Sequence, residues 1–328
     1  MKAVWITSFG DALDLEIRDI PAPSKPNGTE ILVNVRAAGL NRADLLQARG
    51  LYPPPPGYSP NIPGLEFAGE VAFVGDQVTS FEPGDRVFGI TAGEAQAEYL
   101  LIDESIVTSI PSDLSFAEAA AVPEAFITAH DAVYSLGGFK ESEILLVHAV
   151  GSGVGLAALQ LAKANGSFVI GTSRTQDKLD RCVEIGLDAG ILTGKEADFS
   201  AAVKEATNGK GVDCILDLVG AAYFNENLLS LAIKGRMILV GLTSGRETGF
   251  NMGIVLQKRA SIIGTVLRPR PLAEKAEAVR KFAGDVMPLI ASGKVVPNLD
   301  RLFKAKDVVE AYKYLGSNES FGKVVLEF

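Results

Sequence analysis

Short apolar runs separated by turn signals fill the first third of the chain. Runs with β-type composition are residues 30–37, 66–74, 86–89 and 98–102. Between them lie turn sequences such as Lys25-Pro26-Asn27-Gly28, where glycine, proline and asparagine favour reversal of the backbone. This pattern predicts a compact, β-rich domain over residues 1–122.

Strand and helix patterns alternate over the next part of the chain. Residues 144–149 are a continuous apolar run, as expected for a parallel strand that is covered on both faces. Further strands are predicted at 168–173, 214–219, 237–242 and 261–267, and helices at 154–165 and 176–185. Strands separated by helices indicate βαβ crossovers, so we predict a doubly wound parallel sheet domain over residues 123–268.

The last 60 residues return to the mixed character of the first part. They contain an amphipathic helix near 273–290, a short helix near 307–315 and a closing strand at 323–328. We therefore predict an α/β protein in which residues 269–328 complete the domain formed by residues 1–122, so that the sheet domain is an insertion.

Composition narrows the classes of function. A net charge of −9 argues against nucleic acid as a partner. No apolar run reaches the roughly 20 residues of a membrane-spanning helix, and the N-terminus lacks the apolar stretch of a signal peptide. The only cysteines, Cys182 and Cys214, lie in a predicted helix and a predicted strand, so we expect no disulfide scaffold and a cytoplasmic protein.

A glycine-rich turn follows the first strand of the sheet domain and begins a helix. Its residues are Gly151, Ser152, Gly153, Val154 and Gly155. Backbone N–H groups at such a helix N-terminus bind a dinucleotide pyrophosphate, and glycines let the phosphates approach the backbone. Tight strand–helix packing alone would also need glycines, but the surrounding strands favour cofactor binding.

The end of the second sheet strand indicates which dinucleotide is bound. An NAD site usually has an acidic residue there for the ribose 2′-hydroxyl, whereas this chain has Ser173, Arg174 and Lys178. Arginine and lysine suit a 2′-phosphate, so NADPH is favoured. Alternatively, Arg174 and Lys178 are solvated residues at the start of a helix.

Two further segments end the last predicted strands of the sheet. Gly241-Leu242 and Leu267-Arg268 lie where ligands bind in open α/β sheets, so we expect their backbone groups to hold the nicotinamide. The Arg268 side chain could instead be solvated.

The whole chain resembles the medium-chain dehydrogenase/reductase superfamily, and within it the zinc-free quinone oxidoreductases of the zeta-crystallin type. The carrying sequences include Ala38-Gly39-Leu40-Asn41-Arg42-Ala43-Asp44, Ala120-Ala121-Val122-Pro123-Glu124-Ala125 and Phe321-Gly322-Lys323-Val324-Val325-Leu326. The tumour-suppressor-inducible quinone oxidoreductases are the branch that it resembles most.

The resemblance implies a GroES-like catalytic domain, a Rossmann domain, a cleft between them and a homodimer formed through residues 261–267. An apolar edge strand left bare would be prone to aggregation, which independently favours such pairing.

The resemblance also implies roles for residues outside the glycine turn. Asn41, Thr128 and Lys323 are expected to contact the cofactor, and Tyr52 and Phe126 the substrate. Tyr52 is similar to a tyrosine that acts as an acid in enoyl thioester reductases, and Asn41 is the second candidate catalytic residue. Alternatives remain open: Asn41 caps a loop, Tyr52 only packs, and Glu124 is only a charge at a helix start.

Residues expected of a catalytic zinc site are missing. Asn41 stands at the position of the first cysteine ligand, and Leu65 at that of the histidine in a Gly-His-Glu sequence. The chain has only two cysteines and two histidines, none at ligand spacing. We therefore expect that the protein binds no metal and that its substrates are carbonyl compounds that accept electrons easily.

The sequence leads to three functional hypotheses. The first is zinc-independent reduction of quinones by NADPH, through hydride or single-electron transfer. The second is reduction of the C=C bond of enones or enoyl thioesters. The third is a non-catalytic, NADPH-binding sensor.

Overall fold

The computed structural model describes residues 1–194 and 197–328, which divide into two units. Unit 1 comprises Met1–Ile127, Leu267–Ala291 and Val296–Phe328, and unit 2 comprises Thr128–Val266 and Ser292–Val295. None of the helices in these residues is long and apolar enough to cross a membrane.

The borders between the units differ from the predicted ones by a few residues. Unit 1 continues into helix α3 (Pro123–His130), because the backbone N–H of Glu124 donates a hydrogen bond to Glu66 Oε2 (2.8 Å). Unit 1 resumes at Leu267 because the side chain of Arg268 donates hydrogen bonds within that unit. These hydrogen bonds join residues far apart in the sequence, so local sequence patterns could not reveal them.

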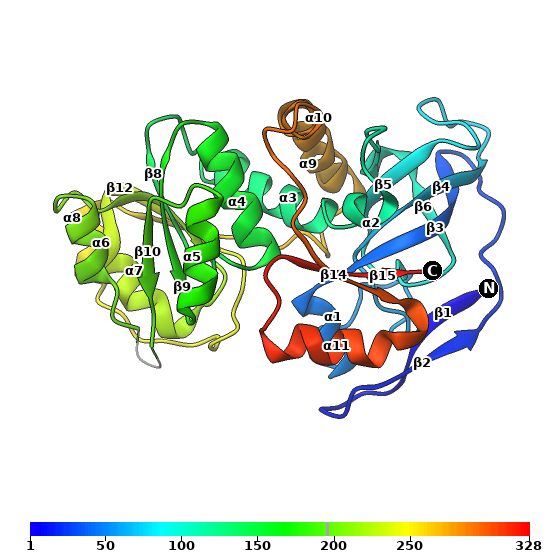
Figure 1. The fold of residues 1–328 in the computed structure, drawn as a ribbon, viewed down its shortest axis with the longest axis horizontal. Coiled ribbons are helices and arrows are strands. Elements are labelled where there is room, and N and C mark those ends of the chain that lie inside the picture. Colours follow the sequence, from blue (N-terminus) through cyan, green and yellow to red (C-terminus); the bar gives the residue numbers. More distant parts are fainter. Residues whose placement is uncertain (195–196) are drawn as a thin grey trace. The chain divides into compact units, whose positions relative to one another are not determined.

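Unit 1 is built on a sheet that combines the two ends of the chain. Its main path runs β14-β15-β3-β4-β5-β7, with β6 paired to β3, and β15 joins β3 in antiparallel register (Figure 1). The strands of this sheet are β3 (Glu30–Leu40), β4 (Glu66–Val74), β5 (Arg86–Ile90), β6 (Tyr99–Asp103), β7 (Val107–Ser109), β14 (Leu299–Lys304) and β15 (Lys323–Glu327). A separate hairpin, β1 (Lys2–Ser8) with β2 (Asp14–Asp19), was not predicted.

The helices of unit 1 complete its core. They are α1 (Arg42–Ala48), α2 (Phe116–Ala119), the start of α3, α9 (Leu272–Asp285), α10 (Met287–Ala291) and α11 (Val308–Ser317). Tyr312 of α11 is fully buried and packs in one apolar cluster with Leu40, Leu45 and Val324. The tail thus shares a core with the N-terminal segment, as the pattern predicts.

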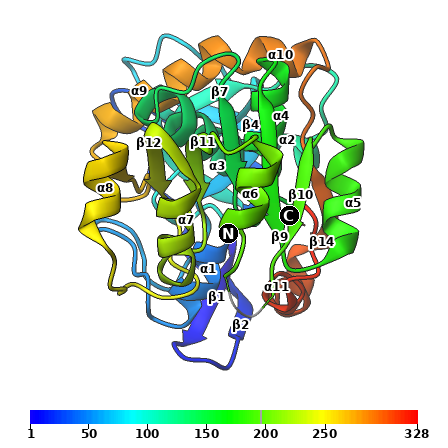
Figure 2. The same ribbon diagram turned by 90° about the vertical axis from the view of Figure 1, so that its left-hand side faces the viewer.

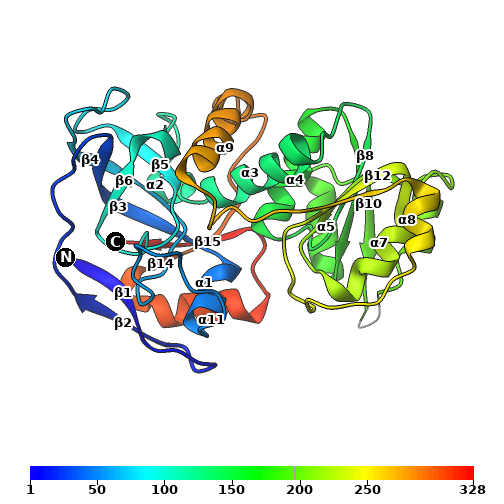
Figure 3. The same ribbon diagram turned by 180° about the vertical axis from the view of Figure 1, so that it is seen from behind.

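Unit 2 contains a parallel sheet of order β10-β9-β8-β11-β12-β13. Its strands are β8 (Ile144–Val147), β9 (Phe168–Ser173), β10 (Ala189–Leu192), β11 (Val212–Asp217), β12 (Leu231–Leu239) and β13 (Ser261–Gly264). Its helices are α4 (Gly153–Ala164), α5 (Gln176–Glu184), α6 (Ser200–Ala206), α7 (Phe224–Ser230) and α8 (Met252–Lys258), which flank the sheet (Figures 2 and 3). The predicted Rossmann fold is confirmed, and its strand order reverses between β8 and β11.

The strand predictions for unit 2 failed at three places. Strand β12 was expected over residues 237–242 but spans Leu231–Leu239. The last strand was expected over residues 261–267 but ends at Gly264, because the chain passes into unit 1 at Leu267. Strand β10 is only four residues long and was not predicted.

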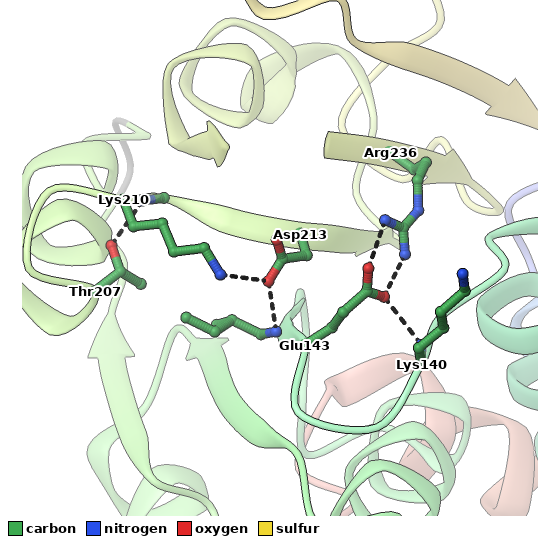
Figure 4. A network of polar contacts seen from close by, with 8 residues as sticks. Lys140, Glu143, Thr207, Lys210, Asp213 and Arg236 are labelled. Carbon is green, nitrogen blue, oxygen red and sulfur yellow. Dashed lines mark hydrogen bonds and ion pairs between the residues drawn. The ribbon is translucent and has the colours of Figure 1, made fainter. Parts of the chain in front are cut away.

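A polar network joins three strands of unit 2 (Figure 4). Arg236 of β12 donates two hydrogen bonds to Glu143 (2.9 and 2.5 Å) and one to the Gly137 carbonyl (2.7 Å). Asp213 of β11 accepts from the backbone of Ile144, the first residue of β8, and from Lys210. These bonds hold the amino ends of β8 and β11 next to Arg236 in β12, away from the carboxyl edge of the sheet.

Candidate functional site

The glycine-rich turn of unit 2 brings a helix N-terminus to the carboxyl edge of the sheet. Ala149, just after β8, adopts a left-handed conformation (φ 49°), and the Ser152 hydroxyl caps α4 by accepting from the Gly155 N–H (3.2 Å). A Cβ on Gly155 would lie 2.6 Å from the Ala149 carbonyl oxygen. The turn therefore tolerates no side chain at Gly155.

This turn has the features that a dinucleotide pyrophosphate needs. Ser152, Gly153 and Val154 are partly exposed, whereas Gly151 and Gly155 are buried. The first turn of the 12-residue helix α4 carries no acidic residue, so nothing offsets its partial positive charge. The residues present thus fit an anionic diphosphate.

A buried hydrogen-bond network supports the same edge. His148 is fully buried, with Nδ1 2.9 Å from Thr172 Oγ1 and Nε2 2.6 Å from Asn227 Oδ1. Because the Asn227 amide donates to Asp217 (3.0 Å), its oxygen must accept from a protonated Nε2. Burial lowers the pKa of His148, so the ring is neutral and joins the ends of β8, β9 and β11.

The end of β9 places two cations next to this edge. Arg174 is exposed and Lys178 is partly exposed, whereas Ser173 is buried. The backbone oxygen of Ser173 accepts hydrogen bonds from the backbone and the hydroxyl of Thr193. The Tyr223 hydroxyl in turn donates to Thr193 (2.8 Å), a contact that the sequence did not suggest.

The residues expected at the ends of the last two strands, Gly241-Leu242 and Leu267-Arg268, belong to different units. Gly241 and Leu242 belong to unit 2, and the Gly241 N–H donates to the Asp217 carbonyl (3.2 Å), whereas Leu242 is exposed. Leu267 and Arg268 are buried and belong to unit 1.

Unit 1 contains a buried cluster of charged side chains around Glu66. Glu66 is fully buried, and its Oε1 accepts from Asn41 Nδ2 (2.8 Å) and from the Lys323 ammonium (2.5 Å). Lys323 also donates to Asn41 Oδ1 (2.6 Å) and to the Leu40 carbonyl. Asn41 is the N-cap residue of α1, where its backbone N–H donates to Asp44 Oδ2 (2.7 Å), while its side-chain amide bonds to Glu66 and Lys323. Contact of Asn41 or Lys323 with a cofactor stays a prediction.

Arg268 holds Tyr52 in unit 1. Its guanidinium donates to the carbonyls of Tyr52 (2.8 Å) and Ala92 (2.7 Å) and to Gln47 Oε1 (2.5 Å), and it lies 5.0 Å from the centroid of the Tyr52 ring. Only 5% of Arg268 is exposed, so the alternative of a solvated side chain is wrong.

Tyr52 itself is partly exposed, and its hydroxyl has no hydrogen-bond partner within residues 1–194 and 197–328. Burial raises the pKa of the phenol, the charge of Glu124 raises it further, and Arg268 opposes both. The phenol is therefore protonated at neutral pH and can donate a hydrogen bond to a ligand.

Sequence reasoning did not name Asp44, Glu66 or Lys275 as candidate site residues, and it considered Glu124 only as a charge at a helix start. Burial raises the pKa of Asp44 to about 6, although the Asn41 and Gly64 N–H groups stabilise its charged form. Burial and the Glu66 carboxylate raise the pKa of Glu124 to about 8, which disfavours a negative charge at this helix start. Lys275 of α9 is 7% exposed. The pair Pro123-Glu124 in an otherwise apolar stretch was the available signal for Glu124.

The remaining predicted residues lie on α3 or in the core. Phe126 is 1% exposed, which favours packing, and its contact with a substrate stays a prediction. Thr128 is partly exposed and begins unit 2. Leu65, at the position expected for a zinc ligand, is 2% exposed, and the described residues include no group of three or more His, Cys, Asp or Glu that could hold a metal ion.

Comparison with known families and proteins gives a consistent result. Residues 27–132 match the alcohol dehydrogenase GroES-like domain, and residues 153–284 match the family described as zinc-binding dehydrogenase. The chain is 30% identical to a quinone oxidoreductase of Rattus norvegicus over 99% of its length and 97% of the relative. It is 32% identical to a quinone oxidoreductase of Pseudomonas aeruginosa, with 99% of each chain covered.

Solved structures agree with this relationship. A quinone oxidoreductase of Pseudomonas syringae superposes with a TM-score of 0.89 at 31% identity, covering 100% of this chain and 99% of the other. A mycobacterial protein in complex with NADPH superposes with a TM-score of 0.88 at 28% identity, covering 100% of both chains. A protein described as an NAD-dependent alcohol dehydrogenase gives 0.86 at 30% identity, again covering both chains fully.

Proposed function

The chain belongs to the medium-chain dehydrogenase/reductase superfamily, with quinone oxidoreductases among its full-length relatives, and we propose that it catalyses the reduction of quinones by NADPH without a metal. The observation that carries the proposal is the partly exposed N-terminus of helix α4 at the glycine turn. Arg174 directly follows β9, the strand that pairs with β8 before this turn.

The cofactor would be held by unit 2. The backbone N–H groups of Gly153 and Val154 would bind the pyrophosphate, whereas the Ser152 N–H already donates to the Ala149 carbonyl (2.9 Å). Arg174 and Lys178 would bind the 2′-phosphate. When bound, NADPH supplies the reducing equivalents. The NADPH complex of the mycobacterial relative supports NADPH as the cofactor. Because another relative is named as NAD-dependent, the preference for NADPH over NADH needs a direct test.

Unit 1 would act on the substrate. Leu65 cannot coordinate zinc, and the Asn41 amide is engaged by Glu66 and Lys323, so a carbonyl group would have to be activated by hydrogen bonds. Tyr52 offers a protonated phenol for this purpose. Quinones suit such a site because they accept electrons without a strong Lewis acid.

The first experiment measures NADPH oxidation with 1,4- and 1,2-quinones, an enone and a crotonyl thioester. We expect the quinones to give the highest kcat/KM. Preference for the enone or the thioester would instead establish alkene reduction. Tight binding of NADPH without turnover of any acceptor would establish the sensor.

A second experiment tests the binding site for the 2′-phosphate. The double variant Arg174→Ala/Lys178→Ala removes two positive charges, so we expect NADPH to bind at least tenfold more weakly while the affinity for NADH barely changes. Calorimetric titration with both nucleotides measures this, with Arg181→Ala on the same helix as the control. Equal weakening of the two nucleotides would show that the assignment is wrong.

A further inference from the structure

Three polar groups in unit 1 have no protein partner. They are the Tyr52 hydroxyl, the Glu124 carboxyl group and the Lys275 ammonium group, none of which makes a side-chain hydrogen bond or ion pair within residues 1–194 and 197–328. The other charged members of the cluster are all satisfied by hydrogen bonds. Lys275 is only 7% exposed, yet its Nζ is not among the fully buried polar atoms, so its ammonium group remains accessible to a ligand.

The environment of Glu124 favours its protonated form. Its backbone N–H donates to Glu66 Oε2 at 2.8 Å, which fixes the start of α3 beside a buried carboxylate. The charges acting on Glu124 come from Asp44 of α1, Glu66 of β4, Arg268 after β13 and Lys323 of β15. Lys323 and Glu66 form an ion pair, so they largely cancel, and burial keeps the proton on Glu124 at neutral pH.

Lys275 and Tyr52 respond to the same carboxyl group. Burial lowers the pKa of Lys275, and Glu124 is the group whose negative charge raises it most. Arg268 acts on both Lys275 and Tyr52, and its three hydrogen bonds fix its position. Glu124 thus acts electrostatically on both Tyr52 and Lys275, and each of the three side chains is free of a protein hydrogen bond within residues 1–194 and 197–328.

We propose that Glu124 is the proton donor of the reaction and that the Lys275 ammonium group binds the substrate oxygen that receives this proton. This inference rests on the proposed function. The reduced acceptor carries a negative charge on that oxygen after hydride transfer, and Lys275 stabilises it. The O–H bond of Glu124 breaks as the new O–H bond of the hydroquinone or enol forms. The Glu124 carboxylate then takes a proton from water, which it can reach because it is partly exposed.

The deciding experiment compares Glu124→Gln and Lys275→Met with matched controls. Glu82→Gln is an exposed change in unit 1, and Lys281→Met lies on the same helix as Lys275. For Glu124→Gln we expect kcat for a quinone to fall about 100-fold or more, the usual range for loss of a general acid, with unchanged affinity for NADPH. For Lys275→Met we expect a higher KM for the acceptor as well as a lower kcat, and Lys275→Arg should restore part of both.

Two readouts separate a proton donor from a structural residue. The wild-type kcat should fall above about pH 8 and show a solvent deuterium isotope effect, and both features should vanish in Glu124→Gln. In the protein without cofactor, infrared titration should show one protonated carboxyl that is lost near pH 8 and is missing in the variant.

The possible failures are distinguishable. If the wild type turns over quinones while Glu124→Gln keeps its kcat and pH profile, or if no carboxyl group titrates near pH 8, this inference is overturned and the proposed function stands. If the wild type reduces none of the acceptors, both are overturned.

Discussion

Glycine 39 shows how strongly single residues constrain the buried charges of unit 1. A Cβ at this position would lie 2.3 Å from Glu66 Oε1, so only glycine leaves room for the carboxylate. Asn41, Lys323 and the Glu124 N–H all donate hydrogen bonds to the Glu66 carboxyl group. Removing one donor should therefore cost far more than removing a surface charge.

We expect Lys323→Met to destabilise the protein by about 3–5 kcal/mol, because it leaves the buried Glu66 carboxylate without its cation. Lys304→Met is the matched control. Lys304 of β14 forms an exposed ion pair with Glu327 of β15, so its loss should cost less than about 1 kcal/mol. Urea denaturation of both variants measures the difference. Similar losses in the two would contradict the assignment of Lys323 as an essential counter-ion.

At the scale of secondary-structure elements, the two edges of the unit 2 sheet differ in what they expose. Strand β13 ends the sheet on one side, with Ile262 exposed, and Met252 and Leu256 of helix α8 are strongly exposed. Strand β10 ends the other side and is a short strand with Leu192 exposed. An exposed apolar edge favours pairing with another strand.

We therefore predict that two chains associate through β13, as the family resemblance suggests. Ile262→Lys places a charge on this edge and should convert a dimer to a monomer of 34.6 kDa, as measured by light scattering during gel filtration. Leu192→Lys on the opposite edge strand should leave the mass unchanged. A wild-type monomer, or a dimer that survives Ile262→Lys, would exclude this interface.

For the whole molecule, the buried acids link stability to pH. The pKa of Glu124 rises from an ordinary 4.5 to about 8 on folding, so between these values the unfolded chain has lost a proton that the folded protein retains. The free energy of unfolding due to this group is thus highest below pH 4.5 and decreases as pH rises to about 8. The pKa of Asp44, about 6 instead of 3.8, acts in the same direction over a lower range.

Glu124→Gln should therefore become more stable relative to the wild type as pH rises from 5 to about 8, and the difference should then level off. Chemical denaturation at several pH values measures it, and Asp44 cancels because both proteins contain it. Glu82→Gln should show a constant difference. A constant difference for Glu124→Gln as well would mean that Glu124 is ionised in the folded protein at neutral pH.

Local features of the sequence were sufficient for the fold and for the glycine turn. The apolar run at 144–149 corresponds to β8, and the predicted helix at 154–165 to α4, with ends shifted by a residue or two. These features depend on neighbouring residues, because strand burial, helix periodicity and turn geometry act over a few positions. The predicted end of β13 was wrong because Leu267 and Arg268 belong to unit 1, where Arg268 bonds to residues far away in the sequence.

The amino-acid order alone was enough to predict a β-rich domain and a doubly wound α/β domain, a turn suited to a diphosphate, and the absence of the usual zinc ligands at Asn41 and Leu65. Folding was needed to assemble the charged cluster, since Glu66, Glu124, Lys275 and Lys323 come from four separate elements and Asn41 lies between β3 and α1. Their protonation depends on the distances between charges and on the loss of water around them, and neither quantity exists until the chain has folded.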